Sequence, residues 1–103
     1  MEQLNLKLKL NDNGSITATW SPITGATRYH AYMYKSGSEK YIVYNEKNLH
    51  TTSYTSKAGL EANRSYEVVL VAYTSKGTVS DGGKVLILSD FYINKTLAVP
   101  RNI

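Results

Sequence analysis

Residues Tyr66-Glu67-Val68-Val69-Leu70-Val71-Ala72-Tyr73 form the segment that most clearly indicates how this chain folds. Its even-numbered members are all apolar or aromatic. Because successive side chains of a strand point to opposite faces, one face of a strand over this segment is expected to be buried. The odd-numbered members after Glu67 are apolar or aromatic as well, and apolar residues on both faces favour a position inside a sheet. We therefore expect residues 66–73 to form a central strand.

Shorter segments before this strand repeat the period of two. From Leu4 to Leu10, four leucines alternate with polar residues, which indicates a strand with one buried and one solvated face. Asn11-Asp12-Asn13-Gly14 follows, and such residues accept the positive φ of a tight hairpin turn. Further alternating runs predict strands at residues 15–20, 29–34, 41–44 and 51–56, the last with Tyr54 inward.

The segment after the central strand is expected to be mostly irregular. Ser75 to Gly83 is predicted to be a turn region, and Asp81 beside two glycines is typical of a turn. A last strand is predicted from Lys84 to Leu88. About seven short strands separated by turn signals indicate an all-β protein, a two-sheet antiparallel β-sandwich.

A chain of 103 residues accommodates one domain of ordinary size. We assign residues 1–88 to this domain and residues 89–103 to a C-terminal extension or a linker toward a following domain. The extension either continues the last strand through Phe91 and Ile93, or folds back so that Leu97 and Val99 cover an exposed edge. A loosely attached terminus is the third alternative.

Three segments resemble the fibronectin type III family in their order and spacing. Ile16-Thr17-Ala18-Thr19-Trp20-Ser21-Pro22 resembles the family's second strand with its core Trp and following Pro, and Gly25-Ala26-Thr27-Arg28-Tyr29 resembles the loop into the third strand. Gly59-Leu60-Glu61-Ala62-Asn63-Arg64-Ser65-Tyr66-Glu67-Val68 resembles the tyrosine corner, with Ala62 where the family often has Pro and Arg64 where it often has Thr. The resemblance implies an immunoglobulin-like (fibronectin type III) sandwich.

Strand periodicity and this resemblance together imply one core between the two sheets. Its expected members are Trp20, Tyr29, Leu60, Tyr66, Val68 and Leu70. The resemblance further implies that the Tyr66 hydroxyl bonds to the backbone within Leu60–Asn63. The last five residues, 99–103, resemble the opening of another repeat, which would place the chain in a tandem array.

Sequence signatures of catalysis, metal binding and cofactor binding are missing. The chain has no Cys, which excludes disulfides, thiol catalysis and thiolate metal sites. His30 and His50 lie in no metal-ligand spacing. No Gly-x-Ser-x-Gly elbow, paired catalytic carboxylates or phosphate-binding loop is found. We therefore expect a protein that is not an enzyme, holds no metal and needs no cofactor.

Charge and hydropathy limit the classes of partner. The net charge is +4, but the lysines are spread along the chain between eight acidic residues, which is typical of a solvated surface, so nucleic acid is not expected as a partner. No apolar run approaches the roughly 20 residues needed to cross a bilayer, so no membrane insertion is expected. The first residues lack the features of a signal peptide, as expected of a mature chain. We expect a monomer.

One surface is a candidate binding site. His30, Tyr32 and Tyr34 share a strand face that is expected to lie beside Val69, Val71 and Tyr73, with Tyr41 or Tyr44 adjoining them. We select Tyr32, Tyr34 and Tyr73 as candidate ligand-binding residues, because flat aromatic side chains stack on sugars or seat another protein. The favoured interpretation is cross-strand packing between aromatic and β-branched neighbours, without a ligand.

The family resemblance implies a non-catalytic module with neighbouring domains of the same parent chain as its partners. The first hypothesis is a spacer or scaffold in a multidomain exported bacterial protein, such as a polysaccharide-degrading or cell-surface protein, located outside the cell or on its surface. The alternative is a carbohydrate- or protein-binding module that uses the tyrosine-rich sheet face.

Overall fold

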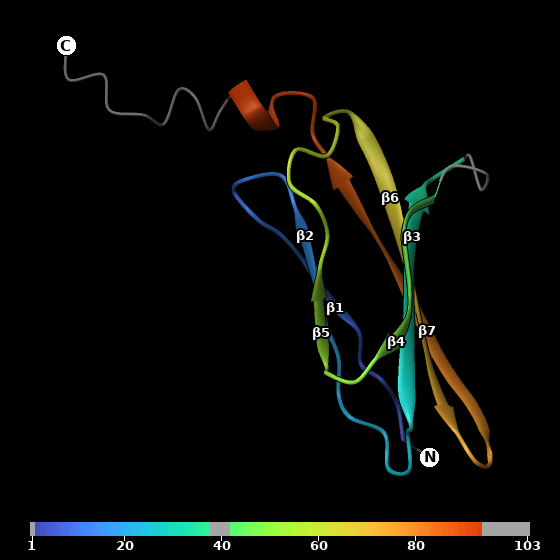
Figure 1. Cartoon of the computed structure of the whole chain (residues 1–103). Helices are drawn as coiled ribbons and strands as arrows, with labels where there is room; N and C mark the ends of the chain where they lie inside the picture. The colour runs from blue at the N-terminus through green and yellow to red at the C-terminus, as the bar shows by residue number, and fades with distance from the viewer. Residues whose placement is uncertain (1, 38–41, 94–103) are drawn as a thin grey trace.

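The computed structural model describes residues 2–37 and 42–93, which form two antiparallel β-sheets facing each other (Figure 1). The strands are β1 (Lys7–Leu10), β2 (Ile16–Thr19), β3 (Arg28–Lys35), β4 (Ile42–Leu49), β5 (Ser53–Thr55), β6 (Arg64–Thr74) and β7 (Gly77–Ile87). One sheet has the order β1-β2-β5 and the other the order β4-β3-β6-β7. The predicted all-β, immunoglobulin-like two-sheet sandwich of seven strands is confirmed.

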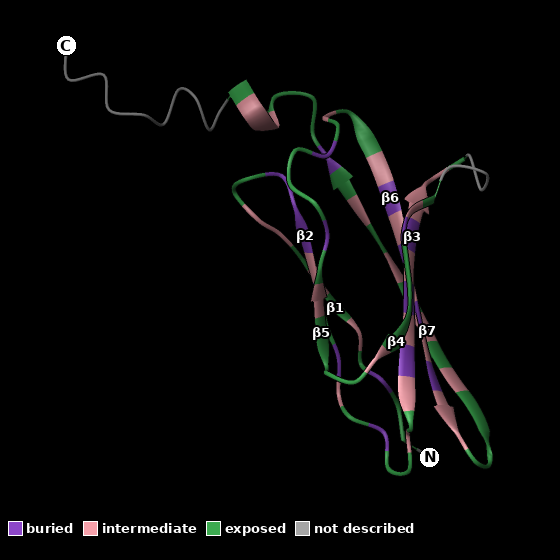
Figure 2. Cartoon of the chain, viewed as in Figure 1, coloured by how far each residue is buried: buried purple, intermediate pink, exposed green. Residues whose placement is uncertain are grey.

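β6 is an inner strand of the larger sheet. It pairs with β3 on one side and with β7 on the other, and both pairings are antiparallel. Its residues alternate between buried and half-buried over nearly the whole strand, as the bands of Figure 2 show. The expected central strand is confirmed, because each face of β6 has apolar side chains and each of its edges has a partner.

The core lies between the sheets and contains all six residues that the sequence placed there. Tyr66 is 1% exposed, and Val68 and Leu70 are fully buried. Trp20 and Tyr29 pack against each other with their ring centroids 5.6 Å apart. The further buried apolar residues of this core are Leu4, Ile16, Ala18, Ile23, Ala31, Met33, Tyr44, Ala72 and Ile87.

The loop that leads into β6 is held from inside the core. The Glu61 backbone N–H donates a hydrogen bond to the Tyr66 hydroxyl over 2.9 Å, so this hydroxyl bonds within the four-residue range that the sequence indicated. Asn63 has φ 61°, a left-handed conformation that Asn tolerates better than most residues. The absence of Pro at Ala62 therefore leaves the tyrosine corner intact.

Two of the early strands differ in extent from their predictions. β1 begins at Lys7 rather than Leu4, because Asn5 has φ 51° and interrupts the extended backbone, although Leu4 is still buried. β4 continues to Leu49, well past the predicted end at residue 44. Its polar second half has no clear period of two, but it pairs with β3 through two register shifts. Cross-strand hydrogen bonds thus extend this strand where side-chain patterning does not.

The prediction of a turn over residues 75–83 is wrong. The chain reverses within two residues, since Thr74 is paired with Gly77, and β7 then runs without a register shift to Ile87. Asp81 is consequently a strand residue opposite Leu70 and not a turn former. Packing explains why position 83 is a glycine, because a Cβ there would lie 3.0 Å from Cδ1 of Leu8 in the other sheet.

The C-terminal extension does not continue the last strand through residues 91–93, as one alternative proposed. These residues form a short helical turn instead, and Phe91 packs against the core. Leu97 and Val99, to which the second alternative assigned the covering of an edge, lie outside the described residues. Among the described residues, no helix has the length and apolar character of a membrane span.

Candidate functional site

The outer face of the four-stranded sheet carries the aromatic side chains that the sequence selected. β3 directs His30, Tyr32 and Tyr34 to this face, because its alternate residues are buried. In the register with β6, Tyr32 lies opposite Val69 and His30 opposite Val71. We name this set of five residues the ring face. The cross-strand neighbours predicted for the two strands are therefore present.

The rings of this face lean on one another along β3. The ring centroids of Tyr32 and Tyr34 are 6.2 Å apart with an interplanar angle of 19°, and those of His30 and Tyr32 are 5.2 Å apart with an angle of 43°. His30 Nε2 is also hydrogen-bonded to Asn45 Oδ1 of β4 over 2.5 Å. All three side chains are half-buried as a result. Each ring thus uses part of its surface on its neighbour.

Tyr73 has a different environment from the other two candidate tyrosines. It lies at the end of β6, opposite Arg28, and the Arg28 guanidinium carbon is 3.8 Å from the Tyr73 ring centroid. This cation–π contact covers one face of the ring. Arg28 is itself fixed, because Nη1 donates a hydrogen bond to the Lys47 carbonyl oxygen over 2.8 Å. Tyr73 therefore has only one ring face open to a ligand.

Tyr44 does not adjoin the ring face, contrary to the expectation from the sequence. It is paired with Met33, whose side chain is buried, and it lies inside the sandwich with 9% exposure. There it packs against Tyr54 of the other sheet at a centroid distance of 4.7 Å. Burial, followed by the neighbouring Tyr54, raises the pKa of Tyr44. Tyr41, the other residue named, lies outside the described residues.

Ile42 is the apolar neighbour that sequence reasoning did not assign to this face. It pairs with Tyr34 across β3 and β4, and it is 50% exposed. The sequence carried no signal for this position, because the face that each residue of β4 presents depends on the register shift beside Tyr34. The ring face is thus bordered by an exposed aliphatic side chain at one end and by an Arg-covered tyrosine at the other.

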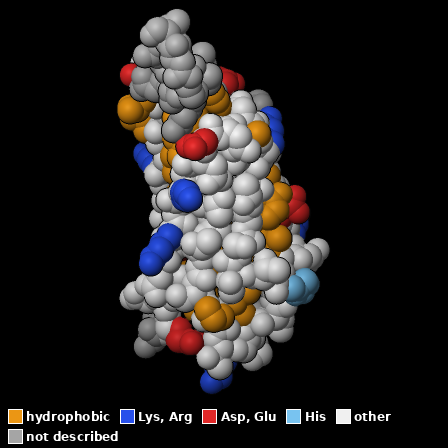
Figure 3. Space-filling view, turned by 90° about the vertical axis from the view of Figure 1, so that its left-hand side faces the viewer, with side chains coloured by type: hydrophobic (Ala, Val, Ile, Leu, Met, Phe, Trp, Pro, Cys, Tyr) orange, Lys and Arg blue, Asp and Glu red, His pale blue; other side chains and the backbone are white. Residues whose placement is uncertain are grey.

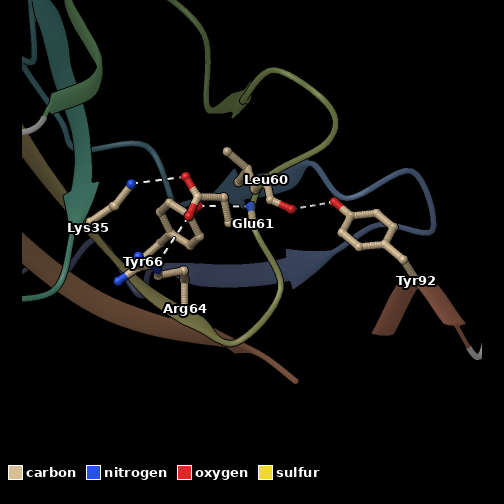
Figure 4. A network of polar contacts seen from close by, with 6 residues as sticks. All are labelled: Lys35, Leu60, Glu61, Arg64, Tyr66 and Tyr92. Atoms are coloured by element: carbon tan, nitrogen blue, oxygen red, sulfur yellow. Dashed lines mark hydrogen bonds and ion pairs between the residues drawn. The ribbon is translucent and has the colours of Figure 1, made fainter. Parts of the chain in front are cut away.

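A second feature, at the C-terminal end of the sandwich, was not predicted. The Tyr92 hydroxyl donates a hydrogen bond to the Leu60 carbonyl oxygen (Figure 4). The Tyr92 ring also lies against Gly14, where a Cβ would be 2.8 Å from Cζ and would overlap the hydroxyl oxygen. The Gly14 carbonyl oxygen in turn accepts a hydrogen bond from Leu60 N–H over 3.0 Å. We name the group of Gly14, Leu60 and Tyr92 the C-terminal clasp.

A charged network lies beside this clasp. Glu61 binds Lys35 Nζ over 2.9 Å and Arg64 Nε over 3.1 Å (Figure 4). The hydrogen bonds from Lys35 and then Arg64 lower the pKa of Glu61. All three side chains are partly or largely solvated, so this network is a surface feature that connects the end of β3 to the tyrosine corner, and it is no catalytic carboxylate pair.

The opposite face of the molecule differs from the ring face. The outward residues of the three-stranded sheet are mainly Lys, Ser and Thr, and Thr17 and Thr55 share a hydrogen bond of 2.9 Å. In Figure 3, which looks toward this side, the middle of the surface is mostly white, and hydrophobic side chains are seen in the upper part, at the right edge and in a patch in the lower part. Within residues 2–37 and 42–93, no group of three or more His, Asp or Glu residues could hold a metal ion.

Comparison with solved structures finds the same fold in proteins of low sequence identity. An Fn3-like protein from Clostridium thermocellum has a TM-score of 0.54 and 23% identity, over 73% of this chain and 77% of that chain. A myokine structure has a TM-score of 0.62 and 18% identity, over 82% of this chain and 94% of that one. The twitchin kinase region from C. elegans, a chain of several parts, has a TM-score of 0.54 and 21% identity, over 81% of this chain and 15% of that chain.

Comparison of the sequence with protein-family models and with curated proteins finds no match. The seven strands of this chain form two sheets, β1-β2-β5 and β4-β3-β6-β7. The chain has the fibronectin type III fold.

Proposed function

We propose that this chain is a non-catalytic fibronectin type III module that acts as a spacer or scaffold between other domains of a multidomain protein. The observation that carries the proposal is the packing of the ring face. His30, Tyr32 and Tyr34 cover one another, and Arg28 covers Tyr73. Aromatic side chains that stack on sugars need open, flat faces beside polar groups in a concave site.

The described grooves of the molecule lie elsewhere, which favours the same proposal. One of about 60 Å³ adjoins Lys35 and Tyr66, one of about 370 Å³ lies between the N-terminal residues and β7, and one of about 170 Å³ adjoins Trp20. None of their linings includes a ring-face residue. This supports the interpretation that the aromatic side chains pack within the sheet rather than on a ligand, because His30, Tyr32 and Tyr34 contact one another along β3 and Arg28 of β3 packs on Tyr73 of β6.

The C-terminal clasp gives the spacer proposal a mechanical basis. Phe91 and Tyr92 pack edge to face with their centroids 4.9 Å apart, Phe91 contacts the core and Tyr92 bonds to Leu60. The chain thus remains attached to the sandwich for several residues after β7. An attached exit limits the directions that a following domain can take, whereas a free linker of the same length would leave them open.

The location of the parent protein is part of this proposal. A cysteine-free sandwich does not depend on the redox state of its compartment. We place the module in an exported bacterial protein, secreted or at the cell surface, with neighbouring domains of the parent chain as its partners. A domain-specific antibody that detects the parent only inside intact cells, and neither in the medium nor on the surface, would contradict this placement.

Titration with a panel of plant and cell-wall oligosaccharides, followed by amide chemical shifts, tests the spacer function. We expect no saturable shift at the ring face. Saturable shifts that disappear in Tyr32→Ala and Tyr34→Ala, but persist in the control Tyr54→Ala on the other sheet, would replace the spacer by a glycan-binding module. Saturable binding of a protein partner that is lost in Tyr32→Ala and Tyr34→Ala would replace the spacer function by that of a protein-binding module.

A further inference from the structure

β7 is one of the two edge strands of the four-stranded sheet. It pairs with β6 over eleven residues without a register shift and contains no Pro, and within residues 2–37 and 42–93 no strand pairs with its other side. Its alternate residues are exposed, and these are Thr78, Ser80, Gly82, Lys84 and Leu86. A long, regular edge of this kind is a template for the addition of another strand, and proteins protect such edges with bulges, prolines or charges.

Asp81 occupies the middle of this edge in an unusual way. It lies opposite Leu70, which is fully buried, so its side chain starts on the core side of the sheet. The carboxylate does not enter the core. Its Oδ1 accepts a hydrogen bond from the Gly82 N–H over 2.8 Å, and its Oδ2 accepts one from the Leu6 N–H over 3.0 Å. One side chain therefore connects β7 to the segment before β1 in the other sheet.

The hydrogen bond from Gly82 has a direct consequence for the edge. In an antiparallel pair, alternate residues direct their N–H groups away from the partner strand. The Gly82 N–H binds the Asp81 carboxylate rather than β6, so it belongs to the outward set. An added strand would have to bring a carbonyl oxygen to this N–H. The carbonyl oxygen would displace the Asp81 carboxylate, and the displaced carboxylate would then lie next to it.

We propose that Asp81 is an edge guard: it prevents a second copy of this chain from pairing with β7 and so keeps the module monomeric. The proposal goes beyond the spacer function and does not depend on it. The guard consists of two hydrogen bonds. Oδ1 accepts the Gly82 N–H, which would otherwise face an added strand, and Oδ2 accepts the Leu6 N–H beside it. Asn5, with its positive φ, turns the chain before β1 so that the Leu6 N–H reaches the carboxylate.

A second copy is the occupant that this edge would accept without the guard. Two identical strands can pair antiparallel about a two-fold axis, which gives a closed dimer with one continuous sheet. Gly82 is exposed and has no side chain to cover the backbone in the middle of the strand, and Lys84 is the other charged residue of β7. Removal of the Asp81 carboxylate would thus open the centre of an otherwise regular edge.

The test compares Asp81→Ala with Asp90→Ala, which removes the same charge from an exposed residue outside β7. Sedimentation velocity over a range of protein concentrations should show monomers for the wild type and for Asp90→Ala, and at least about tenfold tighter self-association for Asp81→Ala. Adding Ser80→Pro to Asp81→Ala should abolish this association. The Ser80 N–H faces the open edge like that of Gly82, two residues away, so Pro there removes no bond to β6.

Three results would overturn the proposal: a wild type that already dimerises through β7, a folded Asp81→Ala that stays monomeric, or a dimer that survives Ser80→Pro. If Asp81→Ala does not fold, amide hydrogen exchange of the wild type decides. The Gly82 and Leu6 amides should then exchange more slowly than those of Ser80 and Lys84. Equal exchange rates at these four amides would refute the guard.

Discussion

Replacing Gly14 by Ala should release the C-terminal clasp, and a matched glycine elsewhere isolates this effect. Gly14 has φ +82° and Gly25 has φ +81°, so Ala carries the same backbone strain at both positions, about 1–2 kcal/mol. Their surroundings differ. A Cβ at Gly25 meets nothing within 4 Å, whereas one at Gly14 would overlap the Tyr92 hydroxyl. Only Gly14→Ala therefore forces Tyr92 away from Leu60.

The extra loss at Gly14 corresponds to the free energy of the clasp. The hydrogen bond from Tyr92 to the Leu60 carbonyl contributes about 0.5–1.5 kcal/mol net, and displacement of the ring adds to this. We expect Gly25→Ala to lower the free energy of unfolding by about 1–2 kcal/mol and Gly14→Ala to lower it by about 2–3 kcal/mol. Denaturant unfolding, with the slope checked for two-state behaviour, measures both values.

Both alanine substitutions should be repeated in a Tyr92→Ala background, where no ring remains to be displaced. There the two losses should become nearly equal, apart from a tight approach of the new Cβ to the Gly59 nitrogen at 3.1 Å. If Gly14→Ala still lowers the free energy of unfolding more than Gly25→Ala, by the same difference as in the presence of Tyr92, the clasp is not the cause and the reasoning is refuted. Fast hydrogen exchange in the wild type at the Phe91 amide, which donates to the Leu88 carbonyl oxygen over 3.0 Å, would also oppose an attached exit.

The other predictions concern the core, the corner and the charged network. Leu70→Ala should destabilise the protein by about 2–5 kcal/mol, because Leu70 is fully buried, and an unchanged denaturant midpoint would contradict its place in the core. Tyr66→Phe should cost about 0.5–1.5 kcal/mol with the fold intact by circular dichroism, since Glu61 N–H loses its acceptor, and an unchanged stability would show that this bond contributes nothing. Glu61 has a lowered pKa, so its contribution to folding stability should be present above its ordinary pKa of 4.5 and should be lost as the pH falls through the lowered value. The wild type and Glu61→Gln should therefore differ in unfolding midpoint near pH 7 and converge in acid. A difference that stays constant with pH would refute the assignment.

Much of the fold was accessible from the sequence, because the features involved are local. A period of two is a property of a few adjacent residues, and it identified β3, β6 and the buried side of each. The core residues followed from the same parity together with the family spacing. The candidate site was accessible in part: Tyr32 and Tyr34 are on the predicted face, but their contacts with one another are a matter of ring orientation, which no sequence pattern specifies.

The features that the sequence did not indicate depend on contacts outside the local segment. Gly82 and Gly83 suggest a turn when read locally, yet pairing with β6 supplies the hydrogen bonds that make them part of a strand. Asp81 acts on Leu6, 75 residues away, and Tyr92 acts on Leu60, 32 residues away.

Local sequence therefore determined where most of the strands lie and which side of β3 and β6 faces the core, since alternation of side chains is built into an extended backbone. The tertiary structure alone decided where β7 begins, how its edge is guarded and how the chain leaves the sandwich. The start of β7 depends on its pairing with β6, and the other two features depend on hydrogen bonds between segments that lie far apart in the sequence, so no segment of the chain carries any of them by itself.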